Sequence, residues 1–155
     1  MSATKLAGFL AILAVTGSAA QEWTVQFWAS VPKTGGSSYG DDVTAPVRAG
    51  ASDNGFDGYA LDVPEPPAPP EGLSFAVVPG FATPAGSARF NAETKGATFA
   101  DGQAKTWPLS LSSYGVTGTC TLTWSADAVP QSLLLHLTTP DDARHDMRVE
   151  TSVSF

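Results

Sequence analysis

The sequence predicts an all-β fold, built from short antiparallel strands that stack as a sandwich or close as a barrel. Apolar residues recur at every second position in several segments, and no segment keeps a 3.6-residue period for three turns. The chain has 15 glycines and 12 prolines, and Gly, Pro, Asn or Asp separates nearly every pair of candidate strands. Many short strands with local turns and without crossover helices are typical of these two architectures.

The strongest strand signals lie in the C-terminal third of the chain. Residues 116–124 alternate apolar or small residues with four threonines, which predicts one buried and one solvated face. Threonine also favours an extended backbone because it is β-branched. Residues 147–155 alternate in the same way, so we expect a C-terminal strand with Val149 and Phe155 facing inward.

Shorter alternating segments supply the other candidates. They lie at residues 23–27, 43–49, 59–63, 73–78, 87–91, 107–111 and 133–137. The expected core joins the inward-facing residues of the clearest strands. These are Trp23, Phe27, Trp107, Leu109, Cys120, Leu122, Trp124, Leu135, Val149 and Phe155.

Residues 1–20 have the pattern of a secretion signal. Lys5 precedes an apolar run at 6–15, and the small residues Ser18 and Ala20 suit a signal peptidase that cleaves before Gln21. The run is about half as long as the roughly 20 residues that span a bilayer as a helix. We therefore expect an exported, water-soluble mature domain of residues 21–155 that is secreted, periplasmic or held at the cell surface.

The charge balance excludes several classes of partner. Lysine and arginine total 8 and aspartate and glutamate total 15, so loss of Lys5 with the signal leaves a net charge of −8. Such a surface repels phosphate backbones and anionic membranes, so we expect no nucleic-acid partner. Cys120 is the only cysteine. An internal disulfide is therefore impossible, and we expect Cys120 to be a small buried residue.

A proline-rich run at residues 64–70 interrupts the strand pattern. Its polyproline II rise of about 3.1 Å per residue makes it a stiff spacer. Only 42 residues, 21–62, precede it in the mature chain, too few for an ordinary independent core. We interpret it as a crossing inside one domain. An interdomain linker and a docking ligand for an aromatic groove are the alternatives.

Residues 51–75, which include DNGFDGYALDVPEPPAPP, resemble an element of secreted bacterial surface proteins. Segments 105–111, 118–124 and 149–155 resemble the W-x-L, T-L-x-W and C-terminal aromatic strands of the same proteins. The resemblance covers roughly residues 40–155. It implies an immunoglobulin-like β-sandwich and a non-catalytic module of the cell envelope or extracellular space. Together with the strand candidates above, we expect a single antiparallel sandwich of seven to nine strands. The resemblance brings no set of functional residues with it.

The densest acidic region could provide oxygen ligands for calcium. Its six carboxylates are Asp41, Asp42, Asp53, Asp57, Asp62 and Glu65. Calcium takes six to eight oxygens, but the spacing is not that of an EF-hand loop. We favour the interpretation that Asp53 and Asp57 form turns with their neighbouring glycines, and we expect no metal site.

Other site chemistry has weak support in the sequence. A structural zinc ion needs four ligands, and His136, His145 and Cys120 are the only imidazoles and thiol. We expect both histidines at the surface. No nucleophile elbow occurs, and Cys120 lies within a predicted strand, so we expect no catalytic residues, no cofactor and no enzyme activity.

The aromatic residues leave two rival functions open. Trp28 lies on the face opposite Trp23 and Phe27, and Tyr39 and Tyr59 flank the acidic region. Aromatic rings on a flat sheet face can stack on sugars, so a carbohydrate-binding module is one alternative to a structural or interaction module. A small outer-membrane β-barrel is the second, although the apolar spans are shorter than lipid-crossing strands and the proline run cannot join a closed ladder.

Overall fold

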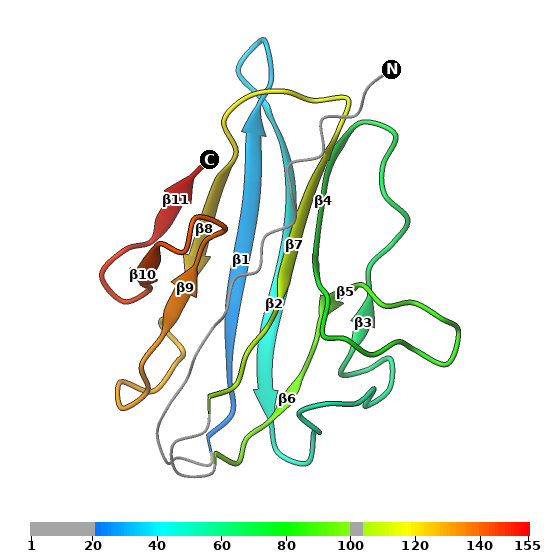
Figure 1. Cartoon of the computed structure of the whole chain (residues 1–155), viewed down its shortest axis with the longest axis vertical. Coiled ribbons are helices and arrows are strands. Elements are labelled where there is room, and N and C mark those ends of the chain that lie inside the picture. Colours follow the sequence, from blue (N-terminus) through cyan, green and yellow to red (C-terminus); the bar gives the residue numbers. More distant parts are fainter. Residues whose placement is uncertain (1–20, 100–103) are drawn as a thin grey trace.

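The computed structural model describes residues 21–99 and 104–155, which form eleven strands and no helix (Figure 1). The all-β prediction is therefore confirmed. Consistent with this, no helix that could cross a membrane occurs in the described residues. The predicted secretion signal, residues 1–20, lies outside them. The strands are β1 (Trp23–Pro32), β2 (Ser38–Arg48), β3 (Val63–Pro64), β4 (Gly72–Val77), β5 (Phe90–Ala92), β6 (Lys95–Gly96), β7 (Leu109–Tyr114), β8 (Thr121–Ser125), β9 (His136–Thr138), β10 (Arg144–Asp146) and β11 (Ser152–Ser154).

Nine of these strands belong to one mixed sheet. Its order is β11-β8-β1-β2-β5-β4-β7, with β3 paired to β5 and β6 paired to β2. The long hairpin of β1 and β2 stands at the centre of Figure 1, with β8 and β11 on one side and β4 and β7 on the other. Strands β9 and β10 form a separate two-stranded sheet.

The pairing departs from the expected all-antiparallel arrangement. Strand β2 runs parallel to β5, where Thr44 meets Ala92, and parallel to β6. A carboxylate also joins β2 to β4, because Asp41 Oδ2 accepts a hydrogen bond of 2.7 Å from the Phe75 amide. Burial raises the pKa of Asp41.

The number of strands is also higher than the predicted seven to nine, because several are only two or three residues long.

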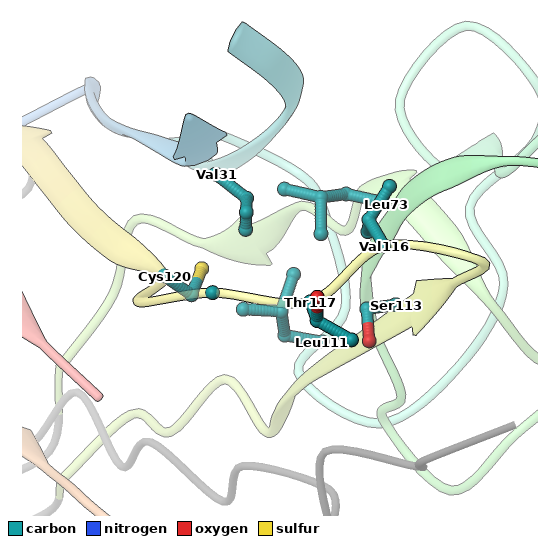
Figure 2. Close-up of a pocket in the computed structure, with 8 residues that line it drawn as sticks. Val31, Leu73, Leu111, Ser113, Val116, Thr117 and Cys120 are labelled. Atoms are coloured by element: carbon teal, nitrogen blue, oxygen red, sulfur yellow. The ribbon is translucent and has the colours of Figure 1, made fainter. Parts of the chain in front are cut away.

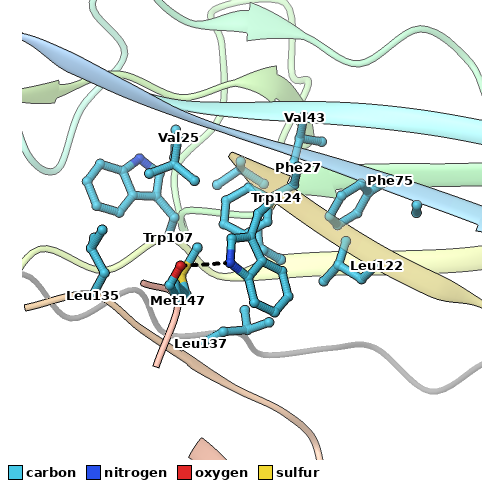
Figure 3. Close-up of a cluster of buried hydrophobic side chains, with 14 of the residues drawn as sticks. Val25, Phe27, Val43, Phe75, Trp107, Leu122, Trp124, Leu135, Leu137 and Met147 are labelled. Atoms are coloured by element: carbon cyan, nitrogen blue, oxygen red, sulfur yellow. Dashed lines mark hydrogen bonds between the residues drawn. The ribbon is translucent and has the colours of Figure 1, made fainter. Parts of the chain in front are cut away.

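The core lies between the inner face of the large sheet and the segment that carries β9 and β10. Leu135, Leu137 and Met147 of that segment meet Phe27 and Trp124 of the sheet (Figure 3). The indole N–H of Trp124 donates a 3.1 Å hydrogen bond to the carbonyl of Met147. Eight of the ten predicted core residues are buried, and Phe155 is half-buried against the same cluster.

The prediction that Val149 belongs to the core is wrong, because this residue is 79% exposed. The chain turns after β10, and the amides of Val149 and Glu150 both donate to the carbonyl of Asp146. The carboxylate of Asp146 accepts the Arg148 amide at 2.9 Å. This turn interrupts the alternation, so the C-terminal strand β11 begins only at Ser152.

Four other predicted strands are shorter than expected. β5 begins only at Phe90 and β9 only at His136. Residues 59–61 form a turn in which the amides of Leu61 and Asp62 donate to the carbonyl of Gly58, so only Val63 of that segment enters a strand. Residues 116–120 form a loop, and β8 begins at Thr121. Gly118 has φ +134° there, a backbone conformation that ends regular alternation.

The proline-rich run connects β3 to β4 within the large sheet. The amide of Glu65 donates to the carbonyl of Arg89 at 3.0 Å, which fixes the start of the run. The Glu65 carboxylate accepts hydrogen bonds from Ser74 Oγ and Arg89 Nε, at 2.6 and 2.5 Å. The run therefore begins with its acidic residue anchored on strand β4.

Candidate functional site

The candidate binding face is the outer surface of β8, β1 and β2, centred on Trp28. Residues along β1 alternate in burial, so that Phe27 and Ala29 belong to the core while Trp28 is 39% exposed. Because successive side chains of a strand point to opposite faces, the packing of its two neighbours turns the Trp28 indole outward. The structure thus places Trp28 as the alternation predicts.

Polar side chains flank Trp28 on both neighbouring strands. Trp28 lies in register with Asp42 of β2 and with Thr123 of β8. Directly opposed residues in antiparallel strands have Cβ atoms about 5 Å apart, so a carboxylate and a hydroxyl border the indole. The Asp42 carboxylate has no hydrogen-bond or ion-pair partner among the described residues, and it is exposed. It is therefore available to an external ligand.

The neighbouring positions on β1 extend this polar surface. Gln26 lies opposite Thr44 and Ser125, and Ser30 lies opposite Gly40 and Thr121. Gly40 has no side chain, whereas Thr44 has one. The sheet surface is therefore less filled beside Ser30 than beside Gln26. The face combines one broad apolar ring with amide, hydroxyl and carboxylate groups. Such a surface can stack against a flat apolar group and hydrogen-bond its polar substituents.

The two tyrosines do not join Trp28. Tyr39 lies in register with buried Val31, on the other face of the hairpin, and its hydroxyl bonds Glu71. This hydrogen bond raises the pKa of Tyr39. Tyr59 is 57% exposed in the turn after Gly58, where its ring lies 4.9 Å from that of Phe56. The aromatic residues therefore form separate features, and Trp28 alone of the three belongs to this face.

The carboxylates of Asp53, Asp57 and Asp62 organise the loop that joins β2 to β3. Asp57 Oδ2 accepts the Ser52 amide at 2.7 Å, and Asp62 accepts the amides of Asp57 and Thr94 at 2.6 and 2.8 Å. Asp53 accepts the Gly96 amide at 3.0 Å and pairs with Lys105. The described residues contain no group of three or more potential metal ligands. Asp57 accepts an amide within the loop, whereas Asp53 bonds only residues outside it, and Asp62 bonds both Asp57 and Thr94.

A buried ion pair lies beneath this loop. Glu93 is fully buried, and its Oε1 lies 3.0 Å from Lys95 Nζ, while Oε2 has no described partner. Burial, opposed by Lys95 and reinforced by the negative charges of Asp62 and Asp53, raises the pKa of Glu93 to about 7. Sequence reasoning missed this pair, because a Glu-x-Lys pattern is usually a solvated strand face.

The two histidines lie in the β9–β10 hairpin and share no ligand cluster with Cys120. His136 is on β9, and His145 is on β10, where it lies opposite Leu137 and within 2.8 Å of Glu150. Both histidines are half-buried.

An apolar cavity is the feature that the sequence did not predict. It lies where the end of β1 and the start of β4 meet β7 and the loop before β8. Its volume is about 120 Å³, and Figure 2 shows its lining residues. The lining residues are Val31, Leu73, Leu111, Ser113, Val116, Thr117, Gly118 and Cys120. The small residues Gly118 and Cys120 are the signal that could have indicated it, since both occupy positions where a larger side chain would fill the space.

Comparison with known proteins gives no further guide to these features, since no family model, curated protein or solved structure matches this chain.

Proposed function

We propose that this chain is an exported, non-catalytic interaction module of the cell envelope or extracellular space, and that it binds its partner through the face centred on Trp28. The proposal joins the predicted secretion signal at 1–20 with the resemblance to immunoglobulin-like modules of bacterial surface proteins. The observation that carries it is the 39% exposure of Trp28 between Asp42 and Thr123 on an otherwise polar sheet face.

A partly exposed tryptophan beside an exposed, unpaired carboxylate is a surface suited to a ligand. Tryptophan is enriched among the residues that contribute most to binding at protein interfaces, because its ring covers a large area and its N–H can hydrogen-bond. Hydrogen-bonding groups next to the ring add specificity. The Trp28 face has both components within three adjacent strands.

Carbohydrate is the second candidate for the ligand class. Sugar rings offer a flat apolar face for stacking and hydroxyls around their edge. The Asp42 carboxylate and the Gln26 amide lie where such hydroxyls would need acceptors and donors. A polysaccharide of the envelope is therefore the alternative to a protein partner.

Affinity capture tests this function. The mature protein, residues 21–155, is immobilised and exposed to native envelope material, in parallel with Trp28→Ala and with Leu134→Ala. Leu134 is 60% exposed on another part of the surface and serves as the matched control. We expect the wild type and Leu134→Ala to retain the same component and Trp28→Ala to lose it. Protease treatment of the envelope then separates the ligand classes, since a polysaccharide survives it. Equal retention by all three proteins would refute the proposed face.

A further inference from the structure

We infer that the cavity beside Cys120 is a binding site for a small apolar molecule, or for the apolar part of a larger one, about the size of a benzene ring. This site is separate from the Trp28 face and does not rest on the proposed function. Trp28 is on the outer face of β1, whereas Val31 of the same strand is on the inner face and lines the cavity.

The size of the cavity sets the class of ligand. Its volume is about 120 Å³. An apolar cavity of about 150 Å³ in a protein core can stay dry and take up benzene. Water gains little in such a space, because a buried water needs two to four polar partners. An apolar ligand of about six carbons instead restores the dispersion contacts that the cavity wall lacks.

The walls of the cavity are mostly apolar, and Ser113 and Thr117 contribute its hydroxyls. Leu73 and Leu111 come from the paired strands β4 and β7, and Val31 is the last buried residue of β1. Figure 2 shows these three side chains and Cys120 around one space. Cys120 is 1% exposed, and burial raises the pKa of its thiol, which therefore stays neutral at pH 7. A neutral thiol behaves as a small apolar group.

The entrance lies at the loop that joins β7 to β8. Val116 is half-buried against the core, while Thr117 next to it is exposed. Gly115 and Gly118 enclose these two residues with φ values of +65° and +134°. A Cβ atom at Gly118 would lie 3.5 Å from Val31 Cγ1. A side chain at this position would therefore occupy space beside Val31 that the glycine leaves open. The hydroxyl of Thr117 gives the entrance a polar rim beside an apolar interior.

Benzene is the probe that tests this inference. It is titrated into the mature protein while amide chemical shifts and the melting temperature are recorded. We expect saturable shifts at the lining residues and a melting temperature that rises with benzene concentration, since a ligand bound only by the native state stabilises it. We also expect benzene to slow the reaction of Cys120 with a thiol reagent, because the ligand covers the sulfur.

Two filled variants and one control make the test specific. Cys120→Leu and Leu111→Phe each place extra carbon atoms in the cavity, and the second serves if the first does not fold. We expect benzene binding at least about tenfold weaker in either variant, the equivalent of about 1.4 kcal/mol. Val149→Leu is the control, because it adds a carbon atom at an exposed position outside the cavity. This variant should bind benzene as the wild type does. Absence of saturable shifts in the wild type, or equal binding by a folded filled variant, would overturn the inference.

Discussion

The carboxylate of Asp53 lies 2.5 and 2.6 Å, through its two oxygens, from the ammonium group of Lys105, which is 52 positions away in the chain. The lysine side chain is only 4% exposed, and the aspartate is 39% exposed. Asp53 also accepts the Gly96 amide. One carboxylate thus ties the loop after β2 to strand β6 and to the segment before β7.

Asp53→Ala should destabilise the fold, because it leaves the buried Lys105 ammonium without its counter-charge. Breaking a fully buried pair costs about 3–5 kcal/mol. Since Asp53 is partly exposed and water can replace it, we expect a smaller loss of about 2 kcal/mol in the free energy of unfolding, measured by urea denaturation. Asp42→Ala is the control, because that carboxylate is exposed and unpaired, and it should change stability by less than about 0.5 kcal/mol. Equal effects of the two substitutions would contradict this role for Asp53.

Calcium should not stabilise the protein, because Asp53, Asp57 and Asp62 already accept backbone amides or pair with lysine. A cation would have to displace those partners. We expect the same melting temperature in excess EDTA and in excess calcium. A melting temperature that rises with calcium concentration would show that the native state binds the ion, and it would refute the turn interpretation.

The unfolding free energy contributed by Glu93 should depend on pH. Its pKa rises from an ordinary 4.5 to about 7 in the folded protein. The folded state therefore favours the protonated form, so this contribution is fully present below pH 4.5 and is lost as the pH rises through 7. Glu93→Gln stays neutral and keeps an oxygen for Lys95. We expect the variant to match the wild type near pH 4.5 and to exceed it at pH 8 by an amount on the order of 3 kcal/mol. A stability difference that does not vary with pH would contradict this assignment.

Gly96→Ala should destabilise the contact between strand β6 and the loop after β2. A Cβ atom there would lie 2.6 Å from the carbonyl oxygen of Ala51, a backbone atom that cannot turn away. We expect a loss of about 1–3 kcal/mol, typical of overpacking. Gly40→Ala is the matched control, because its Cβ would lie at an ordinary 3.6 Å from the Ala29 carbonyl. Thermal unfolding of the two variants should differ clearly, and similar melting temperatures would argue against the close approach.

Local alternation was sufficient to predict much of the fold. It placed Phe27 in the core and Trp28 at the surface, because burial on one side of β1 enforces a period of two. It failed at Val149, where the carboxylate and carbonyl of Asp146 bind the following amides and turn the chain. Such side-chain hydrogen bonds compete with strand pairing and leave the apolar pattern unchanged.

Contacts between distant segments were beyond the sequence. Strands β2 and β5 pair in parallel at Thr44 and Ala92, and Asp53 pairs with Lys105. Both contacts depend on how the sheet curls, which no local pattern encodes. The cavity beside Cys120 likewise depends on three strands meeting around two small residues. The sequence therefore indicated the Trp28 face as a candidate site, while the cavity and the Glu93–Lys95 pair required the three-dimensional arrangement.

The most direct test of the proposed function is a co-sedimentation titration of the mature protein with purified envelope fragments. Wild type, Trp28→Ala and Leu134→Ala are compared at equal concentration after circular dichroism has shown that all three are folded. A tryptophan at the centre of an interface typically contributes 2 kcal/mol or more. We therefore predict that Trp28→Ala binds at least about tenfold more weakly than the other two proteins. Indistinguishable binding curves for the three proteins would contradict the claim that the Trp28 face is the binding surface.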